Sequence, residues 1–230
     1  ADGYNPYRIT DKGIEWEEPD PNDPWASIGY WGDHQIIYLL KLLEFTESLK
    51  SQSLNRLLNE DRFVFADVPY EIKDFNFLEV DPNHSIHFNE ARNAAISERT
   101  QAIGADGKLV HDDQSQIVRA NLFEKLLIPF VVKLSNYVPN GGIWMNTQRP
   151  EWNDANNALA GFGLSMVTTY YMHRYLEFFE SLVEQVEGDS LQCFASLKSL
   201  LESLASVFAR EPESLNQDGH LRYQAVEALG

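Results

Sequence analysis

Apolar residues recur along much of the chain at the spacing of α-helices, and this pattern predicts a mostly helical protein. The two strongest predicted helices cover residues 33–51 and 162–186, because their apolar residues occupy more than a single face. A helix with so wide an apolar surface is buried on several sides, so we expect both to lie inside the fold. Further helices are predicted at residues 53–58, 88–103, 115–137 and 191–209, with a weaker one near the C-terminal end.

Three stretches lack helical spacing. Residues 1–31 contain four prolines, which predict an extended segment rich in turns. Residues 61–87 are predicted to hold short strands or irregular loop, and residues 138–161 to form a loop rich in Gly, Asn, Trp and Pro. Pro129 lies inside the predicted helix at residues 115–137 and should kink or split it.

A loop of unusual composition is followed twice by a helix that is apolar on most sides, at residues 31–50 and 152–186. In a toroid of helical hairpins, the inner helices touch neighbours on all sides, and loops at one end of the inner ring shape a pocket. A plain α-helical bundle also contains helices that are apolar all round. The spacing therefore predicts the all-α class and leaves these two architectures open.

The chain carries a net charge of −17, which excludes nucleic acid as a partner because such binding needs Lys and Arg to neutralise phosphates. The same charge disfavours anionic membrane surfaces, and no stretch is long and apolar enough to span a bilayer. Cys193 is the only cysteine, so no disulfide can form within the chain. No signal peptide is visible at the start, and this absence together with the single cysteine favours a cytoplasmic protein.

The densest polar segment, residues 141–157, lies just before the second strong helix. The N-terminal end of a helix favours negative charge, so Asp154 or Asn156 could simply cap that helix. A cap needs neither tryptophan nor arginine, however, and the presence of both favours a binding or catalytic site. The candidate residues of this segment are Trp144, Arg149, Glu151, Trp152, Asn153 and Asp154.

A second segment, residues 25–35, repeats this combination before the first strong helix. Its candidate residues are Trp31, Asp33 and His34. The alternative is a helix cap at Asp33 with His34 beside it. Two such segments in one chain are harder to explain as coincidence than either segment alone.

Trp152-Asn153-Asp154, followed by Gly-Phe-Gly-Leu-Ser at residues 161–165, resembles the segment around the catalytic acid of the cellobiose and chitobiose phosphorylases. Members of that family carry Asp-Trp-Asn-Asp-Gly and then Gly-x-Gly-Glu-Ser before a helix. Residues 32–40 are similar to the family's upstream Asp-Asp-x-x-Trp-Leu-Pro-Tyr stretch. The resemblance implies that Asp154 is the general acid and that Asp33 holds sugar hydroxyls in the subsite before the cleaved bond, which Trp152 lines.

The resemblance also implies a fold: part of an (α/α)6 toroid, as in the six-hairpin glycosidases. Residues 1–230 would then be a single helical domain with long loops and a short β-hairpin, and a fragment of a larger (α/α)6 catalytic domain. This sequence departs from the family at Glu151, Ala155 and Leu164, where the family has Asp, Gly and Glu. No counterpart of the family's phosphate-binding residues is found, so phosphorolysis and hydrolysis both stay open.

Cleavage of a glycosidic bond with inversion needs an acid on the leaving oxygen and a nucleophile on the opposite face of the sugar. In a hydrolase a second carboxylate, roughly 6.5–9.5 Å from the acid, activates water, and Glu151 is the candidate. In a phosphorylase the phosphate itself attacks the sugar, so Asp154 as general acid is the only carboxylate that the reaction needs. The expected partners are therefore an oligosaccharide or glycoside and, for phosphorolysis, inorganic phosphate. The expected sugar-binding residues are Trp31, Asp33, His34, Trp144, Arg149, Trp152 and Asn153.

His84 and His87 could coordinate a metal, but no third ligand accompanies them, so we predict no metal site and no cofactor. A partial toroid would expose apolar edges, which predicts self-association or assembly with the remaining part of a larger enzyme. The rival interpretation is a non-catalytic helical binding or scaffolding module, or an inactive fragment, in which the acidic loops only cap helices.

Overall fold

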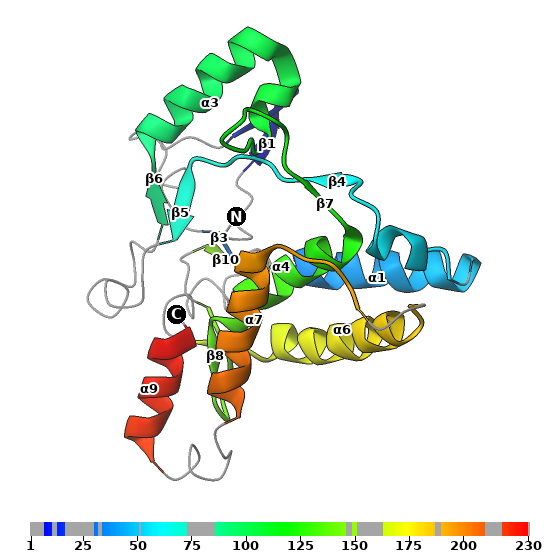
Figure 1. Cartoon of the computed structure of the whole chain (residues 1–230). Helices are drawn as coiled ribbons and strands as arrows, with labels where there is room; N and C mark the ends of the chain where they lie inside the picture. The colour runs from blue at the N-terminus through cyan, green and yellow to red at the C-terminus, as the bar shows by residue number, and fades with distance from the viewer. Residues whose placement is uncertain are drawn as a thin grey trace.

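The computed structural model describes residues 7–10, 13–16, 30–31, 34–50, 52–72, 86–145, 149–150, 163–186, 190–209 and 218–229. Within these ranges the chain is mostly helical with a few short strands, as the apolar spacing predicts (Figure 1). The α-helices are α1 (His34–Leu49), α3 (Glu90–Ile103), α4 (Leu122–Leu134), α6 (Met166–Glu184), α7 (Ala195–Phe208) and α9 (Gly219–Leu229). Two short 3₁₀ helices are η1 (Asn55–Leu58) and η3 (Gly104–Lys108).

The strands form small separate sheets. Antiparallel pairs join β1 (Tyr7–Thr10) to β2 (Gly13–Trp16), β4 (Phe63–Val64) to β7 (Arg119–Ala120), and β5 (Tyr70–Ile72) to β6 (Ile86–Phe88). A three-stranded antiparallel sheet has the order β11 (Leu164–Ser165), β9 (Gly142–Trp144), β8 (Tyr137–Val138). Finally, β3 (Tyr30–Trp31) pairs in parallel with β10 (Arg149–Pro150).

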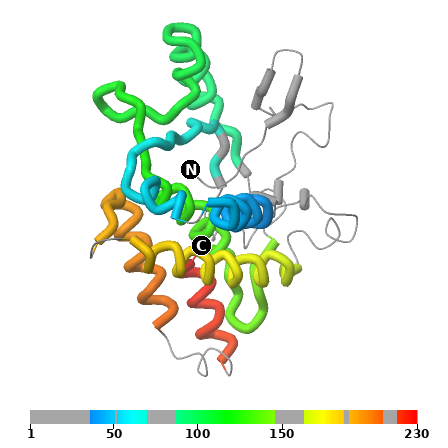
Figure 2. The backbone as a smooth tube through the Cα atoms, turned by 90° about the vertical axis from the view of Figure 1, so that its right-hand side faces the viewer, coloured from blue at the N-terminus to red at the C-terminus, as the bar shows by residue number. Residues whose placement is uncertain are grey.

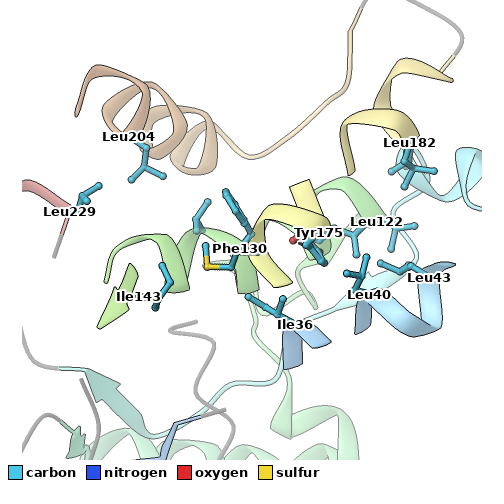
Figure 3. Close-up of a cluster of buried hydrophobic side chains, with 14 of the residues drawn as sticks. Ile36, Leu40, Leu43, Leu122, Phe130, Ile143, Tyr175, Leu182, Leu204 and Leu229 are labelled. Atoms are coloured by element: carbon cyan, nitrogen blue, oxygen red, sulfur yellow. Dashed lines mark hydrogen bonds between the residues drawn. The ribbon is translucent and has the colours of Figure 1, made fainter. Parts of the chain in front are cut away.

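A cluster of buried hydrophobic side chains joins α1, α4 and α6 with α7 and α9 (Figure 3). Tyr175 of α6 lies at its centre, where its ring stacks on Phe130 and its hydroxyl donates a hydrogen bond of 2.6 Å to the carbonyl of Leu126. The helices contribute mainly branched apolar side chains: Ile36, Leu40, Leu43, Leu122, Leu126, Phe130, Met172, Tyr175, Leu182, Leu204, Val207, Ala225 and Leu229.

The helix expected at residues 115–137 begins later than predicted. Asn121 caps α4: its side chain accepts from the N–H of Glu124, and the Glu124 carboxylate accepts from the N–H of Asn121. Such a capping box fixes the first turn of a helix, and the residues just before it, Arg119–Ala120, pair as β7 instead. Pro129 does not split the helix, because α4 runs unbroken over Leu122–Leu134.

The prediction that α1 is buried on several sides is wrong. One face of α1 buries Ile36, Leu40 and Leu43 in the core. The opposite face exposes Leu42 and Phe45, at 61% and 60% of their surface. An apolar residue count cannot show whether another element covers a given face, and here one face of an unusually apolar helix is left in contact with solvent.

The same prediction is wrong for α6, which also exposes apolar side chains, among them Tyr170 at 71%. It buries Thr168, Met172, Tyr175 and Leu182. Its other side carries exposed charged residues, among them Glu177 and Glu180. The helix begins at Met166, four residues after its predicted start, because Ser165 is its N-cap.

A separate network of ion pairs holds α3, which lies apart from α1, α4 and α6 (Figure 1). The Asp67 carboxylate accepts from Arg92 Nε at 2.8 Å and from Arg99 at 2.6 Å. Arg99 also donates to the carbonyls of Gly107 and Leu109. Because α3 buries only Ile96 among its side chains, these charged contacts help to fix its position beside η3.

Replacement of Tyr175 should change how stability depends on pH. Burial raises the pKa of Tyr175 above its usual value of 10. Above about pH 10 the unfolded chain loses this proton while the folded chain keeps it, so stability falls by about 1.4 kcal/mol per pH unit. Tyr175→Phe should cost about 1 kcal/mol at pH 7, through the lost hydrogen bond, but should remove this alkaline loss.

Urea denaturation at pH 7, 10 and 11 measures both effects. Tyr170→Phe is the matched control, since Tyr170 lies on the same helix and is 71% exposed. Equal alkaline losses in the wild type and in Tyr175→Phe would contradict the prediction.

Candidate functional site

The two segments that the sequence singled out meet in the structure. β3 and β10 pair as parallel strands, with Arg149 opposite Tyr30 and Pro150 opposite Trp31. β3 belongs to the segment at residues 25–35, and β10 to the segment at residues 141–157. Their backbones therefore lie side by side although more than a hundred residues separate them in the chain. This pairing brings the candidate residues Trp31 and Arg149 into one region.

A second contact closes the loop that contains β10. The N–H of Met145 donates to the carbonyl of Gly163 at 3.0 Å, and Trp144 lies opposite Leu164 in the ladder of β9 and β11. The two ends of residues 146–162 are thus joined at their base. Glu151, Trp152, Asn153 and Asp154 lie between these two ends in the sequence, and the sheet holds the ends together.

A tight turn positions Trp144. β8 and β9 form a hairpin in which Tyr137 lies opposite Ile143, and Asn140 and Gly142 take positive φ angles of 60° and 133°. A Cβ atom on Gly142 would lie 2.9 Å from the hydroxyl of Thr169, so only glycine fits both the angle and the space. The side chain of Trp144 is half-buried. Its backbone N–H donates to the carbonyl of Asn136 at 2.8 Å.

Hydroxyl groups at the start of α6 hold this hairpin against the helix. The Ser165 hydroxyl accepts from the N–H of Thr168, and the Thr169 hydroxyl donates to the carbonyl of Ser165. Thr169 also accepts from the N–H of Ile143 at 3.1 Å. These residues are not among the candidates predicted from the sequence, although a Ser directly before an apolar helix is a recognised cap signal.

The N-cap of α6 decides whether Asp154 or Asn156 caps this helix. Because Ser165 is the N-cap of α6, neither Asp154 nor Asn156 caps this helix, which is the helix for which the sequence made them candidate caps. For the upstream segment, α1 begins at His34, and Asp33 lies outside the described residues.

The helices that follow the two segments, α1 and α6, pack against each other and cross at an angle (Figure 2). Lys41 lies over the ring of Tyr171 at 5.7 Å, and one turn further along both helices Arg174 forms a two-pronged ion pair with Glu44, at 2.7 and 2.8 Å. Contacts that advance together along both helices indicate that α1 and α6 run in the same general sense. Figure 2, which views α1 nearly end-on with α6 below it, shows the two as neighbours.

The structure describes the candidate residues unevenly. Trp144 is described with its side chain, and Trp31, His34 and Arg149 through the backbone. The remaining candidates lie outside the described residues: Asp33, Glu151, Trp152, Asn153, Asp154 and His84. His87 is exposed on β6. In the part of the chain that the structure describes, no group of three or more His, Cys, Asp or Glu residues could hold a metal ion.

No protein-family model matches this chain, and no curated protein matches it. The resemblance to the cellobiose and chitobiose phosphorylases therefore stands on the quoted motifs alone. Among the described helices, none is both long and apolar enough to cross a membrane.

Proposed function

We propose that this chain is part of the catalytic domain of a carbohydrate-active enzyme that cleaves a glycosidic bond with inversion. The observation that carries the proposal is the pairing of β3 with β10, which joins the two segments rich in Trp and Asp. Unrelated helix caps would have no reason to meet. A sugar-binding site needs aromatic faces, carboxylates and amides from several parts of the chain in one place, and these two segments contain all three.

The arrangement of α1 and α6 supports an (α/α)6 toroid as the wider architecture. In a ring of helical hairpins each inner helix is antiparallel to its outer partner, so all inner helices run in the same sense. Loops at one end of the inner ring then surround the pocket. α1 and α6 run in the same general sense, and the loops that precede them contain the candidate residues.

In this proposal Asp154 protonates the glycosidic oxygen as the bond breaks. Trp152 and Trp31 stack on sugar faces, while Asp33, His34 and Asn153 bind hydroxyl groups. Trp144 lies at the base of the same loop, and Arg149 binds a hydroxyl or a phosphate, since its guanidinium suits both. Attack comes from phosphate in a phosphorylase, or from water activated by Glu151 in a hydrolase.

A panel of glucosides and oligosaccharides, incubated with and without inorganic phosphate, tests the proposal. Release of sugar 1-phosphate only when phosphate is present would support phosphorolysis, and sugar release without phosphate would support hydrolysis. Tryptophan fluorescence under the same sugars reports binding independently of cleavage. A chain that neither cleaves any member of the panel nor changes its fluorescence would overturn the proposal and leave a helical scaffolding module.

A further inference from the structure

The exposed side of α1 carries a regular apolar stripe, formed by Tyr38, Leu42, Phe45 and Leu49. These side chains expose 59%, 61%, 60% and 71% of their surface. Their spacing of four, three and four residues places them along one side of the helix. The same spacing forms the contact seam of two helices packed in a coiled coil, so the occupant best matched to this stripe is another helix.

The charges around the stripe differ from those of the chain as a whole. The chain carries a net charge of −17, yet both acids of α1 are engaged within the protein. Glu44 pairs with Arg174, and Glu47 accepts from the N–H groups of Gln52 and Leu54. Lys41 is the charged residue that borders the stripe within the helix. The stripe is thus a surface on which two strongly acidic copies could approach without opposing carboxylates.

We propose that α1 is the contact surface between two copies of this chain, packed antiparallel about a two-fold axis. A spacing of four, three and four residues reads the same in both directions. Antiparallel pairing therefore places Leu42 against Phe45 of the other copy, and Tyr38 against Leu49. Each leucine then meets an aromatic ring, the two Lys41 side chains lie away from each other, and the opposed helix dipoles attract.

The available area sets the strength of this contact. Burial of four side chains of this size from each copy removes on the order of 900 Å² in total, slightly below the roughly 1,200 Å² at which standard interfaces begin. Tyr170 of α6, 71% exposed, lies one turn before Arg174 and extends the apolar surface beside α1. We therefore expect a dimer with a Kd on the order of micromolar, which tightens as added salt screens the net charge.

Sedimentation velocity on the 230-residue chain, over a series of micromolar concentrations, should show a monomer and dimer in equilibrium. Leu42→Glu should weaken the dimer by about tenfold or more, because it places a carboxylate at the centre of the seam. Leu200→Glu on α7 is the matched control, since Leu200 is also an exposed leucine, at 43%. Far-UV circular dichroism checks that both variants keep their helices, as changes at exposed positions should.

Cysteine cross-linking tests the register. In a Cys193→Ser background, a mixture of Leu42→Cys and Phe45→Cys chains should form disulfides more readily than either chain alone. Stronger cross-linking of Leu42→Cys alone would indicate parallel pairing and overturn the proposed contact. A chain that stays monomeric at every concentration would also overturn it, and would assign the stripe to a helix of another protein. Equal weakening by Leu42→Glu and Leu200→Glu would show unspecific association instead.

Discussion

Glu124→Ala should lower the free energy of unfolding by about 3 kcal/mol, the largest effect on stability that we expect from one polar side chain in this fold. Glu124 is 3% exposed and is bonded through both carboxylate oxygens. One oxygen accepts from the N–H of Asn121 at 3.0 Å, and the other from the N–H of Phe194 at 2.7 Å. Removal of the carboxylate leaves the N–H groups of buried Asn121 and of Phe194 without this acceptor, and it also removes a negative charge from the first turn of α4.

The contact to Phe194 makes Glu124 more than a local cap. Phe194 comes immediately before α7, and Asn121 donates to the carbonyl of Gln192 in the same stretch. The two side chains therefore join the start of α4 to the start of α7 across seventy residues of sequence. Amide hydrogen exchange should accordingly show faster exchange at the N–H of Phe194 in Glu124→Ala, in addition to the loss of global stability.

Urea denaturation at neutral pH measures the change in stability. Glu124→Gln should cost less than Glu124→Ala, about 1–2 kcal/mol, because one amide oxygen can still accept a hydrogen bond. Glu180→Ala is the matched control: Glu180 is an exposed acid on α6, and its loss should change stability by less than about 0.5 kcal/mol. If Glu124→Ala matched that control, the capping box would not be important for stability.

The spacing of apolar residues located most of the helices, but it misplaced the start of α4. Ile117, Val118 and Ala120 continue the helical spacing upstream of Leu122, so periodicity alone extends the helix too far. Asn121 followed three residues later by Glu124 is a capping-box signal that marks the true start. The capping residues therefore locate the start of α4, which the spacing of apolar residues does not.

The exposed stripe of α1 and the contact between the two candidate segments could not be predicted in the same way. Whether Leu42 is covered depends on which elements lie beside α1, and the residues of α1 do not encode that. The pairing of β3 with β10 joins two pairs of residues of ordinary composition, and no local pattern marks either as a strand. The sequence did show that both segments were chemically unusual, and the fold showed that they are neighbours.

Asp154→Asn should lower kcat for an unactivated glycoside by about 10²–10⁴-fold, as expected when a general acid is lost. The amide keeps the shape of the side chain but has no proton to give to the leaving oxygen. The loss should be much smaller for a nitrophenyl glycoside, whose leaving group is stable as an anion and needs little protonation. A comparison of kcat for the two substrates therefore separates proton donation from sugar binding, which would raise KM equally for both.

Glu151→Gln tests the neighbouring carboxylate in the same assay. It should abolish cleavage in a hydrolase that uses Glu151 as its base, and should leave cleavage by phosphate largely intact. Asp113→Asn, which changes an exposed carboxylate remote in sequence from both candidate segments, is the control for a change of charge alone. If Asp154→Asn lowers kcat equally for both substrates, Asp154 positions the sugar and is not the proton donor. If kcat in that variant equals the wild-type value, Asp154 is not the general acid, and Asp33 and Glu151 become the candidates for that role.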